Sequence, residues 1–174
     1  MFAGSKKDGI FRFLVSFIVF FCLIGFAPSG DILAADKPVI GAIEHVIIEP
    51  FGVKVDARID TGASTTSLDA RNIKVSKDTV TFNLSPKFGG AELTVPIIAW
   101  KHVRTSGSRA RRPVVELELC IDAKRIRVLV NLADRSEMRY PLLLGRNVIK
   151  GNFVVDPSRS YLTTPSKDCG DDGK

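Results

Sequence analysis

The sequence predicts an all-β domain closed into a barrel, with one short helix near its C-terminal part. Short runs of alternating apolar and polar residues, the period of a half-buried strand, recur along the chain between turn-forming residues. A long amphipathic helical pattern is missing, and only residues 146–150, directly after Gly145, favour a single helical turn. Closure into a barrel is expected because it leaves no exposed strand edges.

The expected strands form hairpin pairs. Residues 50–52, with the sequence Pro-Phe-Gly, make the turn of the first pair, and residues 122–124 make the turn of the third. In the third pair we expect Glu116 and Glu118 to face Arg125 and Arg127 across the hairpin. The expected strands span residues 39–48, 53–59, 79–84, 92–100, 114–121, 125–132, 153–155 and 160–162.

The first 35 residues predict an export signal. Three basic residues precede an uncharged and almost wholly apolar stretch at 13–27, and small residues at 34–35 offer a cleavage site. We therefore expect a signal peptide or N-terminal membrane anchor at 1–35, a folded domain at 36–164 and a polar tail at 165–174. A cleaved signal would deliver the protein to the periplasm or cell envelope, whereas an uncleaved one would tether it to the inner membrane.

Length and charge restrict the function classes. The chain has 174 residues and a formal net charge of +6, which suits one domain and is too weakly basic to argue for a nucleic-acid partner. Two cysteines, Cys120 and Cys169, lie after the export signal. In an oxidising compartment they could pair within one chain or between chains. Alternatively, Cys120 is a small apolar residue buried in a strand.

One acidic turn carries the candidate chemistry. The strand at residues 53–59 runs into Asp60-Thr61-Gly62-Ala63, a tight turn that would expose the carboxylate at the rim of the sheet. Hydrolysis of a peptide bond by carboxylates needs two of them sharing one proton. Because the chain holds a single Asp-Thr-Gly, a catalytic Asp60 requires Asp60 of a second subunit across a two-fold axis. We therefore expect a homodimer as a condition of activity.

A second motif lies downstream, where three leucines are followed by Gly145-Arg146-Asn147. Together the two motifs resemble those of the retropepsin-like aspartic proteases, which implies a single-lobe acid-protease barrel and endopeptidase activity on a peptide or protein in the cell envelope. The chain is also similar to the bacterial members often labelled "ATP-dependent zinc protease" and linked to RimK-type glutamate ligases. The segments that carry this similarity, within residues 40–162, are 104–107, 112–115, 134–138, 140–146 and 155–156.

The resemblance implies roles for the residues of both motifs. Asp60 would be the catalytic residue and Thr61 would bond across the dimer. Gly62 would let the substrate approach, and Ala63 completes the active-site turn. The residues packed behind this turn would be Leu144, Gly145 and Arg146.

One position departs from the viral members of the family. Viral retropepsins carry an acid shortly after the turn, and this acid pairs with the arginine of the later motif. Ser64 and Thr65 stand there in this chain. Arg146 is therefore expected to find another partner, with Asp69 and Asp156 as candidates.

The resemblance also implies a flap over the substrate. The glycine-bearing turn best placed for it contains Phe88, Gly89 and Gly90. Basic residues around 104–112 form either a solvated loop or a cradle for carboxylates, which arginine binds through two hydrogen bonds. Arg104 and Arg112 are the candidate contacts to an acidic substrate.

No metal and no cofactor is expected. The chain has only two histidines, His45 and His102, without the spacing of a zinc motif, and it lacks a glycine-rich loop ending in Gly-Lys-Ser or Gly-Lys-Thr. An exported, homodimeric aspartic endopeptidase is the first functional interpretation. The alternative is a catalytically silent peptide-binding or accessory module on the same fold, recognising acidic or glutamate-modified segments.

Overall fold

The computed structural model describes residues 37–49, 51–105, 108–166 and 169. The chain divides into two units, Met1–Asp36 and Lys37–Lys174, and the described residues all belong to the second. The predicted signal or anchor at 1–35 and most of the predicted tail therefore lie outside the described residues. Within the described residues, no helix is long and apolar enough to cross a membrane.

Nearly all regular structure in the described residues is β. Two short helical turns accompany the strands, the 3-10 turn η1 (Pro86–Phe88) and the helix α2 (Arg146–Ile149). The predicted turn at residues 146–150 is thus present as α2. The strands are β1 (Val39–Ile40), β2 (Ile43–Glu49), β3 (Val53–Ile59), β4 (Thr66–Asp69), β5 (Arg71–Ser76), β6 (Thr79–Asn83), β7 (Glu92–Pro96), β8 (Ala99–Thr105), β9 (Ser108–Ile121), β10 (Lys124–Ala133), β11 (Leu142–Leu144) and β12 (Val154–Val155).

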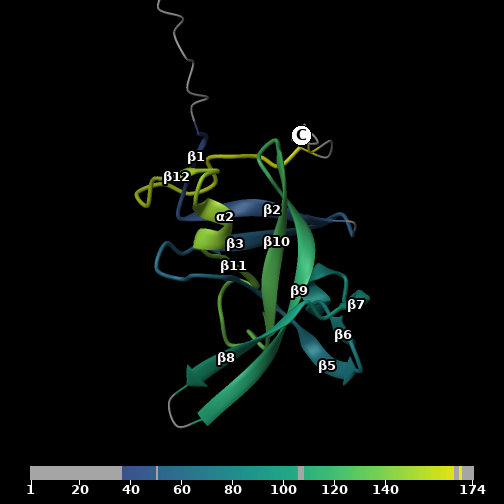
Figure 1. Ribbon diagram of the computed structural model, residues 1–174. Coiled ribbons are helices and arrows are strands. Elements are labelled where there is room, and N and C mark those ends of the chain that lie inside the picture. Colours follow the sequence, from purple (N-terminus) through teal and green to yellow (C-terminus); the bar gives the residue numbers. More distant parts are fainter. Residues whose placement is uncertain (1–36, 50, 106–107, 167–168, 170–174) are drawn as a thin grey trace, which may run out of the picture. The chain divides into compact units, whose positions relative to one another are not determined.

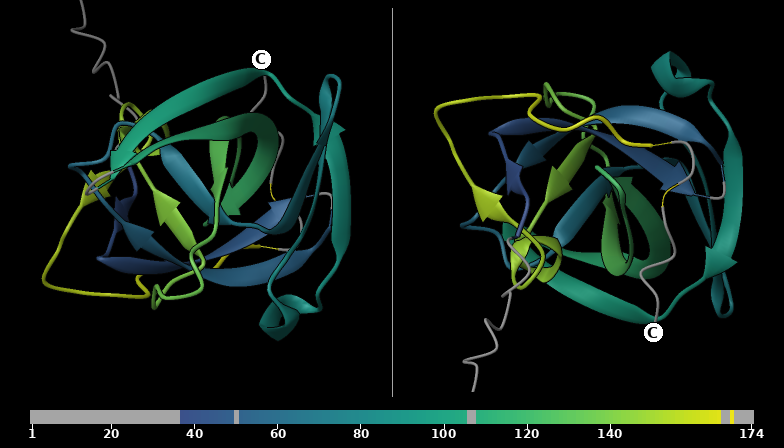
Figure 2. Two further views of the ribbon diagram at one scale, coloured as in Figure 1. Left: turned by 90° about the horizontal axis from the view of Figure 1, so that it is seen from below. Right: turned by 90° about the horizontal axis from the view of Figure 1, so that it is seen from above.

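Six strands close into a barrel. Their order is β10-β4-β11-β3-β2-β9, and β9 returns to pair with β10, which completes the ring. Figure 2 views this ring from two opposite sides. The prediction of an all-β closed barrel is therefore confirmed. The remaining strand of this sheet, β8, pairs only with β9, and the two form a hairpin that extends from the barrel (Figure 1).

The β9–β10 hairpin has the expected facing. Leu119 and Val130 are fully buried, because alternate residues of each strand point into the core. On the other face, Glu118 binds Arg127 at 2.9 Å and Arg125 at 3.5 Å. The cross-strand ion pairs predicted from the alternation are thus formed.

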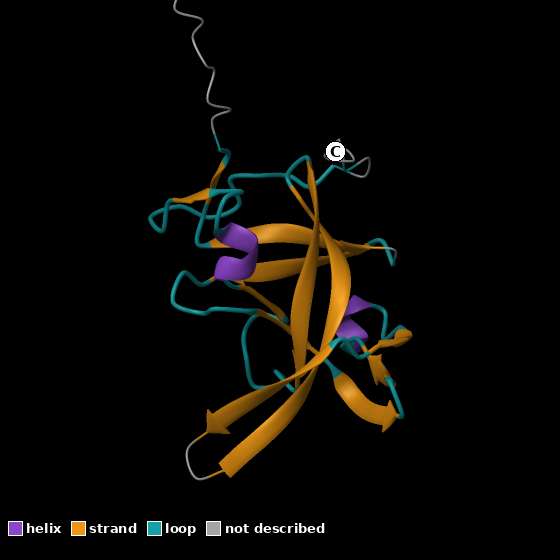
Figure 3. Ribbon diagram, viewed as in Figure 1, coloured by secondary structure: helices purple, strands orange, loops and turns teal. Residues whose placement is uncertain are grey.

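A separate three-stranded sheet, β5-β6-β7, packs against the barrel (Figure 3). Phe82 and Leu93 from this sheet are buried in the same hydrophobic cluster as the barrel residues. β5 is an exposed edge strand with a register shift between Arg71 and Lys74. The segment that leads from β6 to β7 contains η1.

The C-terminal segment departs from its prediction. Residues 160–162 form no strand, and Tyr161 has a φ of +56°. Instead of entering a sheet, the backbone N–H groups of Leu162 and Thr163 donate to the buried carboxylate of Glu44, both at 3.0 Å. A side chain therefore satisfies the groups that a neighbouring strand would have satisfied, and the strand prediction was wrong.

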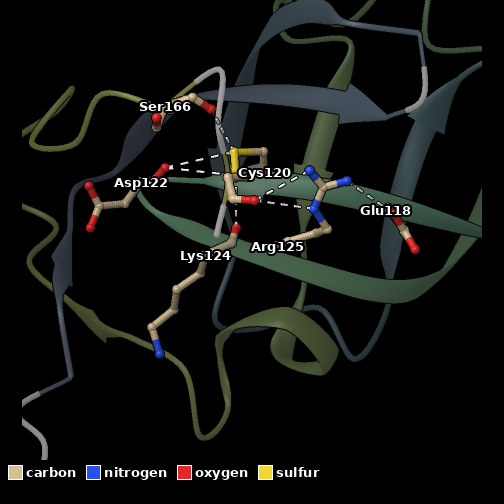
Figure 4. Close-up of a disulfide and its surroundings, with 7 residues drawn as sticks. Glu118, Cys120, Asp122, Lys124, Arg125 and Ser166 are labelled. Carbon is tan, nitrogen blue, oxygen red and sulfur yellow. Dashed lines mark hydrogen bonds and ion pairs between the residues drawn. A yellow bond between two sulfur atoms is a disulfide. The ribbon is translucent and has the colours of Figure 1, made fainter. Parts of the chain in front are cut away.

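A disulfide joins Cys120 in β9 to Cys169, 49 residues later, with Cα atoms 5.9 Å apart (Figure 4). The backbone beside it is also held, because Ser166 N–H donates to the Asp122 carbonyl at 3.0 Å and Arg125 donates to the Cys169 carbonyl. Of the alternatives open from the sequence, the structure has the bond within one chain.

Candidate active site

The turn at the end of β3 presents the Asp60 carboxylate at the rim of the barrel. Its Oδ1 accepts hydrogen bonds from the N–H groups of Gly62 at 2.9 Å and Ala63 at 3.1 Å. Among the described residues no protein group donates to Oδ2. One oxygen of this half-buried side chain is thus fixed by the turn, while the other is open to a ligand.

The second motif lies directly behind this turn, as expected from the sequence. β11 runs parallel to β3 and antiparallel to β4, so it is inserted between the strands on either side of the turn. Asp60 N–H donates to the Leu144 carbonyl, and Arg146 N–H donates to the Ala63 carbonyl, both at 2.9 Å. Gly145 is buried against the backbone of Thr65. The structure therefore brings together segments that are about eighty residues apart in the chain.

Arg146 supports the turn through main-chain carbonyls. Its Nη1 donates to the carbonyl oxygens of Thr61 at 3.0 Å and Gly62 at 2.7 Å. Pairing with Asp69 or Asp156 was predicted and is wrong, because the first of these acids pairs with Arg71 and the second with Arg159. Only Gly145 separates β11 from α2, so the Arg146 guanidinium lies against the carbonyl groups of the turn instead.

Two polar side chains around the turn have contrasting environments. Thr61 is exposed, and its hydroxyl makes no hydrogen bond to any described residue. Asn147 links three elements: its Oδ1 accepts from the Thr66 N–H and hydroxyl, both at 2.9 Å, and its Nδ2 donates to the Leu129 carbonyl at 2.9 Å. This linking role of Asn147 was missed, although its position after Gly-Arg was the available signal.

Arg135, in the loop before β11, lies within the electrostatic influence of Asp60 and of two other arginines. Burial lowers the pKa of the Arg135 guanidinium below its ordinary value, and the neighbouring charges of Arg112 and Arg58 lower it further. Asp69 and Asp60 act in the opposite direction on the same group. Charges from β3, β9 and the Asp60 turn thus all act on Arg135.

Of these cations, only Arg112 was expected from the sequence. Lys101 in β8 lies opposite Arg112 of β9 in the backbone register of the hairpin. Its Nζ donates a hydrogen bond to the hydroxyl of Thr65, which follows the Asp60 turn. The backbone of Arg104 pairs with that of Arg109 in the same hairpin, but the side chain of Arg104 lies outside what the structure describes.

The predicted flap residues lie between β6 and β7. Phe88 ends η1 and packs against the hydrophobic core, and Gly89 and Gly90 follow with φ of +85° and +62°. Nothing in this arrangement tests whether the segment covers a substrate, and the flap assignment stays a prediction. The β8–β9 hairpin also contacts the segment that follows the Asp60 turn, through the hydrogen bond from Lys101 to Thr65.

The histidines have structural partners or face solvent. His45 Nδ1 lies 2.8 Å from the Asp56 carboxylate, and its ring contacts Tyr161 with centroids 4.7 Å apart. His102 is exposed in β8. Across the described ranges, no group of three or more histidine, cysteine or acidic side chains is arranged to hold a metal ion.

A profile of the family described as "Retropepsin-like aspartic endopeptidase RimB" matches residues 39–166 of the chain. The chain belongs to the RimB-like family of retropepsin-like aspartic endopeptidases. This assignment confirms the resemblance inferred from the two motifs and agrees with the closed barrel. Membership places the described domain among protease-like domains.

One related protein matches this chain over its whole length, whereas other relatives are much longer than the matched region. A crystal structure of a Legionella pneumophila protein of unknown function is 30% identical, with a TM-score of 0.64, and the match covers 74% of this chain and 100% of that one. Proteins named "Probable alpha-L-glutamate ligase" from Parasynechococcus marenigrum and Shewanella pealeana are 30% and 28% identical over 72% and 74% of this chain. The chain spans only 29% and 30% of the length of these two ligases.

Proposed function

We propose that the protein is an exported aspartic endopeptidase that acts as a homodimer, with Asp60 of each subunit forming one catalytic pair. The observation that carries this proposal is the asymmetry of the Asp60 carboxylate. Oδ1 is fixed by two backbone N–H groups, and Oδ2 has no donor among the described residues. A carboxylate held in this way is available to a second carboxylate, to water and to a substrate.

The pair would work as a shared acid and base. Two carboxyl groups a few ångströms apart cannot both ionise, so one stays protonated. The ionised Asp60 takes a proton from a water molecule, whose oxygen attacks the peptide carbonyl carbon. The protonated Asp60 donates to the carbonyl oxygen, which stabilises the developing negative charge. Collapse of the tetrahedral intermediate breaks the C–N bond: the Asp60 that took the proton from water gives it to the leaving nitrogen, and the other Asp60 takes back a proton from a hydroxyl of the intermediate, so the pair again holds one proton.

The surface around the turn and the strand ends supports a symmetric dimer. The hydroxyl of Thr61, the residue that follows Asp60, is exposed and makes no hydrogen bond within the described residues. The β1–β12 sheet has only two strands in the described part of the chain, so its outer edges are available for pairing. Val39 and Val154 in these strands are 40% and 52% exposed. A two-fold axis near these features would bring the two turns together.

The charge beside Asp60 favours an acidic peptide as substrate. Arg58 and Arg112 act electrostatically on Arg135, as Asp60 does, and Lys101 donates a hydrogen bond to the Thr65 hydroxyl. Guanidinium groups bind carboxylates with two parallel hydrogen bonds. The matched relatives named as glutamate ligases agree with a substrate that contains glutamate. The β8–β9 hairpin, which carries Lys101 and Arg112, would cover the bound peptide.

The disulfide supports an exported location for the protein. A bond between Cys120 and Cys169 persists in the periplasm or outside the cell and is rare in the reducing cytosol. This chemistry agrees with the charged and apolar pattern of residues 1–35. Cell fractionation with a reporter fused to the C-terminus would test the location, and a cytosolic reporter would contradict it.

Cleavage of glutamate-rich peptides at mildly acidic pH tests the activity. The wild-type chain should cleave, Asp60→Asn should not, and the matched control Asp78→Asn, at an exposed turn, should cleave as the wild type does. Equal turnover by wild type and Asp60→Asn would remove the catalytic claim. Peptide binding without cleavage by either protein would instead support a silent binding module. A strictly monomeric protein at micromolar concentration with peptide present would contradict the shared pair.

A further inference from the structure

A small basic cavity lies between η1 and the loop before β11. Its volume is about 120 Å³, and its walls include the side chains of Lys87, Arg135 and Arg139 together with Asp69 and Arg71. Four of these five groups are cationic and one is anionic. The cavity is separate from the active-site turn but adjoins its cationic neighbourhood, because Asp60 and Asp69 both act electrostatically on Arg135.

The single acid of the cavity is already fully engaged. Asp69 is 4% exposed, and its oxygens accept from Arg71 Nε at 2.9 Å and Arg71 Nη2 at 2.8 Å. Its Oδ1 also accepts from the Arg135 backbone N–H at 2.7 Å. Asp69 therefore neutralises Arg71 and anchors the loop. Lys87, Arg135 and Arg139 are left without a carboxylate partner among the described residues.

Arg135 is the central group, because most of its donors have no acceptor. Nε donates to the Tyr140 carbonyl at 3.4 Å, a long hydrogen bond. The two Nη nitrogens, with four N–H donors, bond to no described residue. Burial holds the pKa of this guanidinium below its ordinary value, so the charge is partly removed from water. A partly buried cation with unused donors is stabilised by an anion that fits beside it.

A larger depression continues from the small cavity along the three-stranded sheet. It has a volume of about 700 Å³ and shares Arg71 with the small cavity, and its walls include the amide side chains of Asn72 and Asn83, Gly90 and the carboxyl group of Asp134. The two cavities thus adjoin the β5–β7 sheet and η1, and neither is lined by residues of the Asp60 turn. An extended peptide held at the catalytic turn could continue into them.

We propose that Arg135, Lys87 and Arg139 form a subsite for the carboxylate side chain of a bound acidic peptide. The β5–β7 sheet with η1 then serves as a specificity element attached to the barrel, and the Asp69–Arg71 pair positions the loop that carries Arg135. This inference rests on the proposed function for its substrate class. It gives the segment around Phe88, which lines the small cavity, a role as a wall of the binding site.

Binding to a fluorescent hexaglutamate peptide with an amidated C-terminus tests the subsite directly, in full-length protein carrying Asp60→Asn so that cleavage does not interfere. We expect Arg135→Gln to weaken binding about tenfold or more, the loss of one charged hydrogen-bonded contact. Lys87→Gln and Arg139→Gln should each weaken it by a smaller factor. Lys74→Gln, on exposed β5 of the same sheet and outside both cavities, is the matched control and should bind unchanged.

Two further arms identify what the subsite recognises. A hexaglutamine peptide with a free C-terminal carboxylate should bind weakly to all variants; binding equal to that of hexaglutamate would assign the site to chain termini and overturn the proposal. Inorganic phosphate at millimolar concentration should compete only slightly. Should Arg135→Gln fail to fold, the Lys87→Gln/Arg139→Gln double variant carries the test, and an unchanged Kd in that protein would refute the subsite.

Cleavage assays separate this inference from the proposed function. If peptides bind through Arg135 and no protein cleaves them, the subsite stands and the peptidase proposal fails. If the wild type cleaves hexaglutamate and Arg135→Gln does so with unchanged KM, the peptidase proposal stands and the subsite fails. The expected result is a raised KM for acidic peptides with a nearly unchanged kcat, because Arg135 contacts a remote side chain of the substrate.

Discussion

Gly145 lies so close to Thr65 that a methyl group at position 145 would come within 2.6 Å of the Thr65 carbonyl carbon. The backbone of Gly145 is extended, with φ of −91°, so the requirement is for space and not for an unusual conformation. This contact lets β11 enter between β3 and β4. It thereby brings the Arg146 guanidinium beneath the turn that carries Asp60.

The first prediction concerns this contact. Gly145→Ala should lower the free energy of unfolding by about 1–3 kcal/mol, because the added methyl group meets backbone atoms that cannot move aside. The Asp60 turn should also shift, which would reduce peptide cleavage. Urea denaturation and cleavage rates measure the two effects. Gly52→Ala, at a turn with φ of +62° and open space around it, should lose some stability and keep its cleavage rate.

The second prediction concerns Arg146. Arg146→Met removes the hydrogen bonds to Thr61 and Gly62, so we expect cleavage to fall at least tenfold. Because Arg146 is exposed, the stability loss should be small, about 0.5–1.5 kcal/mol. Arg159→Met, at another exposed arginine, should leave cleavage unchanged. Full activity of Arg146→Met would show that the turn holds its geometry without the guanidinium.

The sequence predicted the turn and its support because both depend on local chemistry. Asp60 follows an alternating strand and precedes a glycine, and Gly145 closes an apolar run, so each motif is visible within a few residues. The partner of Arg146 was not predictable in the same way. Its acceptors are main-chain carbonyls, which every residue carries, and only the packing of β11 against the turn selects them.

Other features depend on contacts that no local pattern reveals. The cavity around Arg135 is built from a loop and from η1, which lie about fifty residues apart in the chain. A strand was predicted at residues 160–162, but the backbone N–H groups of Leu162 and Thr163 donate instead to the buried carboxylate of Glu44 on β2. A pattern of three residues cannot indicate which partner will satisfy its hydrogen bonds.

The third prediction concerns the disulfide. Replacing both Cys120 and Cys169 by serine should lower the free energy of unfolding by about 2–4 kcal/mol, because the bond closes a long loop in the unfolded chain. A reductant should lower the Tm of the wild type toward that of the double variant and leave the variant unchanged. A wild-type Tm that does not respond to complete reduction, verified by thiol labelling, would contradict the prediction.

The fourth prediction concerns acid stability near the C-terminal strand. Hydrogen bonds from Ser158, followed by those from Arg159, lower the pKa of Asp156 from 3.8 to about 2. A carboxyl group with a lower pKa in the folded state stabilises the fold above its unfolded pKa and loses that contribution as the pH falls through the folded value. We therefore expect the contribution of Asp156 to disappear between about pH 4 and pH 2. A carbon-detected NMR titration should place its midpoint near 2, and the Ser158→Ala/Arg159→Gln variant should move it up toward 3.8. An unshifted midpoint in the wild type would mean that these hydrogen bonds do not persist in solution.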